Sequence, residues 1–229
     1  MEAGRGDGAA LAAAAERSRP VALAREHVLP ALPALAPLLP DGALRRGTTL
    51  AVGGGAARSL ALALAAGPSA AGSWVGVVGL ASLGLAAAAE VGVALERLLL
   101  VAAPPPAEWA TVVATLVDGM DVVIVGLPRS VRAGDARRLQ ARVRQRGAVL
   151  VVLGSPGSFE PELSVVAEVE GWVGLEAGAG HLQGRRVVAA TTGRRAAARS
   201  RRLALWLPDS EGLVRADDTA VVVPLRGTA

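Results

Sequence analysis

The 229-residue sequence predicts an α/β fold, with a mainly parallel sheet, helices on both faces and antiparallel strands at the C-terminal end. Three observations predict it. Short apolar runs alternate with helix-forming segments as far as Leu153, which is the pattern of a doubly wound sheet. The unbroken apolar run 122–125 suits a parallel strand buried on both faces. Beyond Trp172, strand-like runs follow one another without intervening helices, which favours antiparallel pairing.

The individual elements follow from propensity and from chain-breaking residues. We expect strands over 48–52, 74–78, 98–102, 122–125 and 148–153, and helices over 60–66, 80–91, 107–117 and 135–146. Strands over 172–176, 185–191 and 201–207 follow, with turns at 178–180 and 192–195 and an edge strand over 221–225. Gly67-Pro68 should end the first helix. Trp74 and Trp172 should lie in the core, whereas Trp109 and Trp206 are the candidates for exposure.

Three regions are predicted along the chain. Residues 1–37 form an Ala/Pro-rich extension, with a helix over 9–17 and only short helical turns among the prolines between 20 and 40. Residues 38–207 form the α/β core. Residues 208–229 form a tail that contains the edge strand.

Composition excludes several classes of chemistry. The chain has no cysteine, and its two histidines, His27 and His181, lie far apart, so neither a thiol nucleophile nor a Cys/His metal site is expected. The apolar runs are too short to cross a membrane, and the N-terminus lacks the pattern of a signal peptide. We therefore expect a cytoplasmic protein that has neither a metal nor another cofactor.

Positive charge is concentrated in two segments, and all 24 basic residues are arginine. Residues 129–146 carry a net charge of +6 and residues 185–202 one of +7, on an otherwise acidic chain. Solvated arginine is one reading, and a surface for nucleic acid or an acidic partner is the other. The candidate contact residues are Arg137, Arg138, Arg142, Arg144, Arg146, Arg194, Arg195 and Arg199.

A glycine-rich loop follows the first expected strand. Gly53, Gly54 and Gly55 lead to Arg58-Ser59 at the start of a helix, which is the layout of a phosphate-binding loop. The lysine of a working loop is missing, although backbone donors and Arg58 leave residual phosphate binding open. With no histidine nearby, we expect Ser59 to cap the helix rather than to act as a nucleophile.

The order and spacing of these segments resemble the RecA ATPase core over residues 38–207. The resemblance rests on the lead-in to the glycine loop (38–52), the segment before the third strand (90–100), the helix and Walker B strand (108–127) and the later strand (147–155). It implies a RecA-like fold.

The same resemblance implies four catalytic positions that this chain has changed. Gly126 stands where the Walker B aspartate is expected, Val78-Gly79-Leu80 where the catalytic glutamate is expected, and Gly154-Ser155 where the sensor is expected. The loop lysine is also absent. Because phosphoryl transfer depends on these groups, we expect a pseudo-ATPase. The DNA-contacting loops look eroded too, since the segment after Gly154 is acidic and would repel phosphate.

Among degenerate RecA-like proteins, the chain is similar in size and character to the ImuA-type mutasome accessory family, to which the cell-division inhibitor SulA is related. That resemblance implies a non-catalytic adaptor in DNA repair, acting in SOS-induced, error-prone translesion synthesis with an ImuB-type inactive relative of Y-family polymerases. Direct DNA binding would be weak or absent, and homo-oligomerisation is left open. The alternatives are a SulA-like division inhibitor or a RecA-derived DNA-binding protein.

Overall fold

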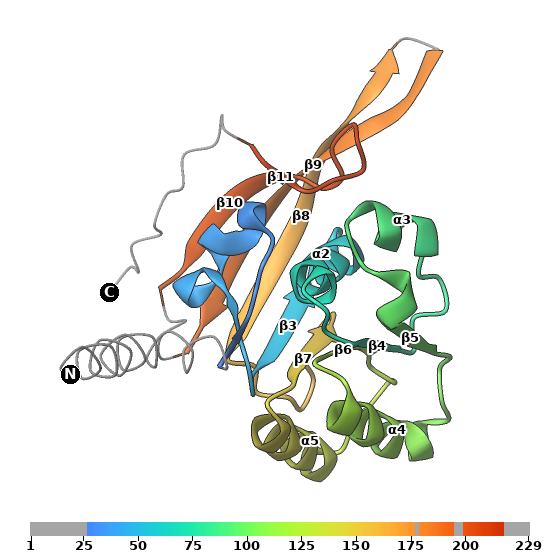
Figure 1. The fold of residues 1–229 in the computed structure, drawn as a ribbon, viewed down its shortest axis with the longest axis vertical. Coiled ribbons are helices and arrows are strands. Elements are labelled where there is room, and N and C mark those ends of the chain that lie inside the picture. Colours follow the sequence, from blue (N-terminus) through green and yellow to red (C-terminus); the bar gives the residue numbers. More distant parts are fainter. Residues whose placement is uncertain (1–26, 177–178, 195–198, 218–229) are drawn as a thin grey trace, which may run out of the picture.

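The computed structural model describes residues 27–176, 179–194 and 199–217, which form a nine-stranded sheet with helices on both faces (Figure 1). The strand order is β11-β10-β9-β8-β3-β7-β6-β4-β5, and a separate two-stranded sheet joins β1 (Val28–Leu29) to β2 (Leu44–Arg45). The predicted α/β fold is confirmed. The helix expected over 9–17 and the strand over 221–225 lie outside the described residues.

The parallel half of the sheet contains the five predicted strands: β3 (Thr49–Gly53), β4 (Val75–Val78), β5 (Leu98–Val101), β6 (Val122–Gly126) and β7 (Val149–Leu153). Leu50 is in register with Val151, and Val151 with Ile124, on three neighbouring strands. Side chains of β6 and β7 are buried on both faces, which explains why these strands read as continuous apolar runs.

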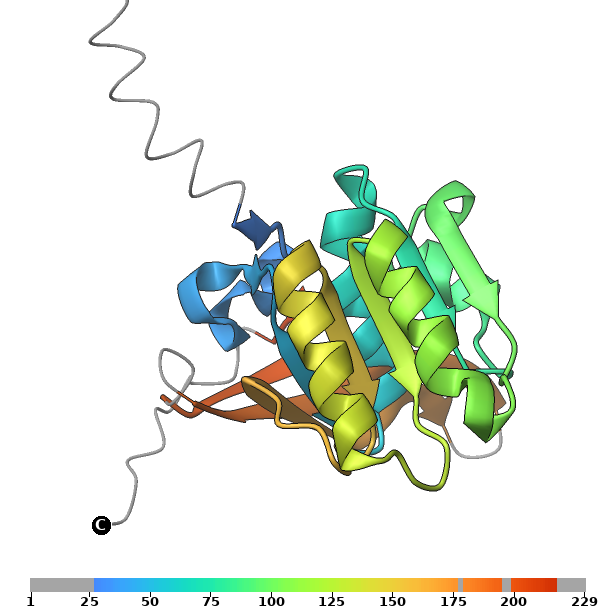
Figure 2. The ribbon, with the colours of Figure 1, turned by 90° about the horizontal axis from the view of Figure 1, so that it is seen from below.

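Helices cover the two faces of this half and create two apolar cores. On one face α2 (Ala57–Ala70) and α3 (Leu85–Glu90) pack with the segment that precedes β3. On the other face α4 (Pro106–Gly119) and α5 (Ala133–Arg146) lie side by side (Figure 2). Helix α5 ends at Gly147, whose φ of 71° is the left-handed conformation that glycine adopts readily.

The residues before β3 are folded onto the first core. Two short 3-10 helices, η1 (Pro33–Leu38) and η2 (Pro40–Gly42), confirm the short helical turns predicted among the prolines. Leu35 and Leu38 are fully buried against α2 and the sheet. Among the described residues, no helix is long and apolar enough to cross a membrane.

The antiparallel extension consists of β8 (Leu163–Glu176), β9 (Ala179–Gly193), β10 (Arg201–Trp206) and β11 (Arg215–Ala216). Strand β8 joins the two halves, because it pairs in parallel with β3 and antiparallel with β9. The expectation that this strand begins at Trp172, after an acidic loop, was wrong by nine residues. Leu163, Val165 and Ala167 alternate toward the core, but the outward-facing Val166 is also apolar and exposed, which concealed the alternation in the sequence.

Two helix boundaries also differ from expectation. Helix α2 continues through Gly67-Pro68 to Ala70. Gly67 serves packing here, because a Cβ atom on it would lie 2.7 Å from the carbonyl oxygen of Pro30. Helix α3 has six residues instead of the twelve expected over 80–91, since a turn occupies residues 80–84.

The two tryptophans expected in the core are exposed, one of the two candidates for exposure is buried, and the other, Trp206, is of intermediate exposure. Trp74 and Trp172 are 45% and 48% exposed, whereas Trp109 is 3% exposed. Trp109 lies on the inner face of α4, where its ring meets Phe159 edge-on and its indole N–H donates to the carbonyl of Gly126. Trp172 follows an irregularity in the β8–β9 pairing, on a hairpin that extends beyond the body of the protein (Figure 1). Propensity alone assigned Trp74 and Trp172 to strands, but it could not show which faces of those strands are covered.

Candidate functional site

The glycine loop lies at the carboxyl ends of the parallel strands, the edge where open α/β sheets bind their ligands. Strand β3 ends at Gly53 and helix α2 begins at Ala57, so only three residues form the connection. The residue before α2 is Ala56, which provides no side-chain cap. The predicted capping role of Ser59 was therefore wrong, because Ser59 lies within the first turn of the helix.

Strand β8 occupies the space in front of this loop. The amide of Ala56 donates to the carbonyl of Ala167 at 2.9 Å, and the amide of Gly55 donates to the Glu168 carboxylate at 3.4 Å. Gly54 has a φ of 90°, and a Cβ atom on it would lie 2.3 Å from the Ala167 oxygen. The chain's own carbonyl and carboxylate thus accept from the amides that would face a phosphate in a working loop.

Ser59 is held by a residue from the antiparallel extension. Its hydroxyl accepts a hydrogen bond of 2.6 Å from the guanidinium of Arg185, which also donates to the carbonyl of Leu207 at 2.7 Å. The same guanidinium lies 5.1 Å from the centre of the Trp172 ring. Desolvation lowers the pKa of Arg185 below its ordinary value. Arg58 is exposed, so Arg185 rather than Arg58 is the cation that contacts the loop serine.

Two segments that the sequence resemblance assigns to the Walker B aspartate and the catalytic glutamate, Gly126 and Val78-Gly79-Leu80, lie beside one another at this edge. Gly79 follows β4 and Gly126 ends β6, on adjacent strands. A Cβ atom on Gly126 would lie 3.0 Å from the Gly79 carbonyl oxygen and 3.1 Å from a methyl of Leu80. An aspartate at Gly126 would therefore require its neighbours to move.

The same edge continues with glycine on the remaining parallel strands. Gly53 ends β3, and Gly154 follows β7 in a left-handed conformation with a φ of 82°. The carboxyl ends of β3, β7, β6 and β4 therefore present backbone where an enzyme of this fold would present side chains. No cluster of three or more His, Cys, Asp or Glu residues suited to a metal ion occurs among the described residues.

Three of the five candidate arginines on α5 are paired within the fold. Arg142 and Arg146 both bind Asp118 of α4, with Arg142 donating through two nitrogens at 2.7 and 2.5 Å. These hydrogen bonds, led by the one from Arg142, lower the pKa of Asp118 from 3.8 to about 2. Arg138 pairs with Asp135 one turn away at 2.6 Å. The two pairs with Asp118 join α4 to α5, whereas the Arg138–Asp135 pair lies within α5.

The remaining candidates divide into three groups. Arg194 pairs with Glu160 at 2.9 Å, and that hydrogen bond lowers the pKa of the glutamate. Arg199 is exposed, and Arg195 lies outside the described residues. Arg137 and Arg144 form no ion pair within the described part of the chain, and both line a cavity together with Arg194. The structure thus brings together one arginine of the second basic segment and two of the first.

Sequence reasoning missed an exposed apolar arm at the end of the β8–β9 hairpin. Trp172, Val173, Leu175 and Leu182 are all exposed, Leu175 to 61%. These residues lie beyond the part of β8 that pairs with β3, which ends at Val166. Apolar residues on both sides of a strand, with glycines between them at Gly171 and Gly174, were the sequence signal, but it reads equally well as a buried strand.

The geometry defines a protein of RecA-like fold. The crystal structure of the RadB recombinase is similar at a TM-score of 0.56 and 12% sequence identity, covering 76% of this chain and 92% of that one. The chain belongs to the family described as the MT3502 N-terminal domain, whose model matches residues 37–157, more than half of the chain. A Mycobacterium tuberculosis (strain ATCC 25618 / H37Rv) protein named "Uncharacterized protein Rv3395c" is 43% identical over 97 residues, which are 42% of this chain and 47% of that relative.

Proposed function

We propose that this protein is a non-catalytic, RecA-derived adaptor, and that it serves as an ImuA-type accessory subunit of an SOS-induced, error-prone translesion synthesis complex in the cytoplasm. Two observations together support the adaptor role. Strand β8 occupies the space in front of the glycine loop, and the end of the β8–β9 hairpin is an exposed apolar arm. The identity of the complex rests on the resemblance of the sequence to that family, and an ImuB-type polymerase relative is the proposed partner.

The contacts of β8 with the glycine loop support the proposal that the protein does not turn over ATP. A nucleotide would have to displace the Ala167 carbonyl from the Ala56 amide and repel the Glu168 carboxylate from beside Gly55. A magnesium ion would then meet no carboxylate at Gly79 or Gly126, whose backbones already lie close together. Phosphoryl transfer depends on positioned charge, and these residues supply neither a cation for the phosphates nor a carboxylate for the metal.

The apolar arm supports docking of a protein. Exposed aromatic and aliphatic side chains that cluster on one projecting element are typical of interfaces rather than of a solvated surface. The guanidinium of Arg185 lies over the ring of Trp172. Because this contact restricts the ring in the free protein, the ring loses less conformational entropy when a partner binds. Because Trp172 and Val173 are successive residues of β8 and point to opposite faces of the strand, a partner that wraps around the arm could bury both.

The structure gives less support to nucleic acid as the main partner. Arg142, Arg146, Arg138 and Arg194 are each paired with a carboxylate. Glu168 and Glu170 lie exposed on β8; Glu170 pairs with Arg186, and Glu168 lies next to the glycine loop, where it would repel phosphate. The acidic residues lie on a strand and not, as expected, in a loop, but the electrostatic argument is unchanged.

Co-purification with an ImuB-type relative of Y-family polymerases from the same organism tests the proposal. We expect a complex with the wild-type chain that Trp172→Asp together with Leu175→Asp abolishes, while thermal unfolding of the free protein stays unchanged. Charge reversal at Arg137 should weaken the complex less. Arg142, which the sequence alone predicts to be a free contact, is a poor choice for such a test because its loss would uncover Asp118.

Mutagenesis in cells decides the biological role. Deletion should abolish damage-induced mutation, and the double arm variant should not restore it. An unchanged mutation rate combined with filamentation on overexpression would instead indicate a SulA-like inhibitor of division. Tight binding to DNA that falls steeply with salt would indicate a DNA-binding protein.

A further inference from the structure

A second candidate site lies at the amino ends of the parallel strands, the end of the sheet opposite the glycine loop. Two cavities adjoin there, of about 210 and 470 Å³, and they share Arg144, Glu162 and Arg194 as lining residues. The smaller one is lined mainly by apolar groups of the segment before β3, and the larger one by polar and charged groups of α5 and the loop before β8. A ligand spanning both would need an apolar part and a charged part.

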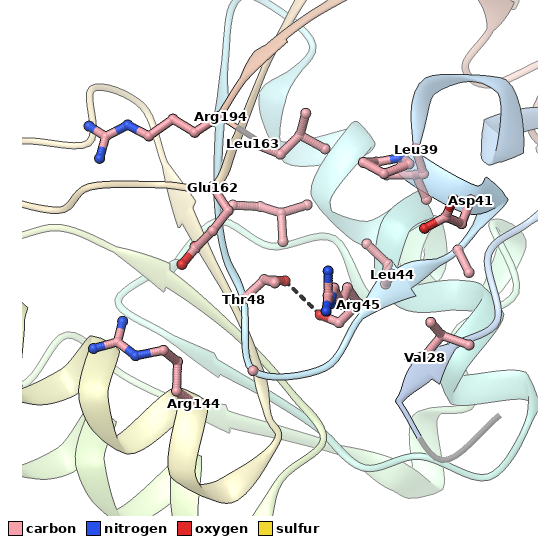
Figure 3. Close-up of a pocket in the computed structure, with 14 residues that line it drawn as sticks. Val28, Leu39, Asp41, Leu44, Arg45, Thr48, Arg144, Glu162, Leu163 and Arg194 are labelled. Carbon is pink, nitrogen blue, oxygen red and sulfur yellow. Dashed lines mark hydrogen bonds between the residues drawn. The ribbon is translucent and has the colours of Figure 1, made fainter. Parts of the chain in front are cut away.

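The apolar cavity has a preformed floor. Leu39, Leu44, Leu50 and Leu163 line it and are buried, so their positions are fixed by the first core. Figure 3 shows Leu39, Leu44 and Leu163 around the opening, with Val28 of β1 at its border. A volume of about 210 Å³ is below the roughly 300–1,000 Å³ typical of small-molecule sites. It suits the anchoring side chain of a peptide better than a whole cofactor.

The charged cavity favours an anion. Its two glutamates already have partners, because Glu162 accepts from the amide of Thr49 at 2.7 Å and Glu160 pairs with Arg194 at 2.9 Å. Arg144 forms no ion pair with another described residue, and the exposed Arg137 lines the same cavity. In Figure 3 the side chains of Arg144 and Arg194 extend to the same side of the opening, away from the leucines.

We propose that this pair of cavities binds a short acidic peptide segment of a protein partner, with one large apolar side chain in the smaller cavity and carboxylates against Arg144 and Arg137. The inference rests on the proposed docking function and adds to it a second contact, distinct from the apolar arm. An apolar anchor in a desolvated pocket with charged groups at the rim is the usual arrangement of a peptide-binding hot spot.

Selection of random dodecapeptides displayed on phage, using the purified full-length chain as bait, tests the proposal even while the partner is unidentified. We expect enriched sequences with a Leu, Ile, Phe or Trp flanked by Asp or Glu. Enrichment of basic sequences, or of none, would overturn the proposal. The best sequence is then synthesised with a fluorescein label, and its affinity is measured by fluorescence anisotropy.

Variants of the residues that line the two cavities show where the peptide binds. Arg144→Glu should weaken binding roughly five- to tenfold, and Ala43→Trp, which fills the apolar cavity from its border, should weaken it at least as much. Arg129→Glu is the matched control: it makes the same change of charge at an exposed arginine that forms no ion pair with another described residue and lies outside both cavities, and it should bind like wild type. Thermal unfolding verifies that each variant is folded.

Equal affinity of the wild type and both cavity variants would overturn the proposal, because the peptide would then be binding elsewhere. The result is separable from the proposed function. If Arg144→Glu loses peptide binding but no mutasome partner is detected, the site is retained and the mutasome role is refuted. If a mutasome partner is detected but Arg144→Glu binds the peptide like wild type, the site alone is refuted.

Discussion

The carbonyl oxygen of Ala167 lies against Gly54 so closely that a Cβ atom on Gly54 would come within 2.3 Å of it. The same oxygen accepts the amide of Ala56. The glycine loop is therefore a packing surface for strand β8. This contact links the parallel half of the sheet to its antiparallel extension, at the place where a related fold would hold a phosphate.

Substituting Gly54 should be costly. Gly54→Ala adds a side chain to a residue with a φ of 90° and forces it onto the β8 backbone, so we expect a loss of at least about 2 kcal/mol in the free energy of unfolding. Gly55→Ala is the control, because its Cβ would meet only side-chain atoms at 3.6 Å or more. Urea denaturation measures both. Equal stability of the two variants would show that β8 is not packed against the loop.

ATP should neither bind tightly nor be hydrolysed. Addition of ATP with Mg²⁺ should leave the thermal midpoint unchanged, because the loop amides already have acceptors and a like charge, Glu168, stands beside Gly55. Glu168→Ala removes that charge and should permit only weak phosphate binding. Magnesium-dependent turnover by pure wild-type protein that Arg58→Ala abolishes would contradict this prediction.

Arg185 should stabilise the fold through three contacts at once. Its guanidinium donates to Ser59 and Leu207 and lies over Trp172, so Arg185→Ala should cost about 2 kcal/mol of unfolding free energy. Arg185→Lys should recover little, because an ammonium lacks the planar fork that meets both acceptors. The exposed Arg129 provides the control, and Arg129→Ala should change stability by less than about 0.5 kcal/mol.

The contact between α4 and α5 should depend on pH through Asp118. Its pKa falls from 3.8 to about 2 in the folded protein, chiefly because of the hydrogen bond from Arg142. A depressed folded pKa means that the stabilisation is complete above pH 3.8 and is lost as pH falls toward 2. Asp118→Asn should therefore be less stable than wild type at neutral pH, and the difference should narrow as the pH falls through that window. A difference independent of pH would contradict the ion-pair origin.

Much of the fold could be predicted from the sequence because its information is local. The runs at 122–125 and 149–153 are apolar at every position, and helix α5 carries its own stop signal, the capping Gly147. The absence of lysine and the glycine at 126 could also be read directly, since they are facts of composition and order. Local periodicity and residue identity were sufficient for these features.

Only the tertiary structure decided what the altered site became. Gly55 and Glu168 are separated by 113 residues, and Ser59 and Arg185 by 126, so no local pattern could reveal that β8 fills the loop or that an arginine from β9 holds its serine. The pairing of Arg142 with Asp118 crosses two helices in the same way. Exposure of Trp172 depends on how far the hairpin extends beyond its neighbouring strands. These features arise from contacts between segments distant in sequence, and their geometry is fixed only when the sheet is assembled.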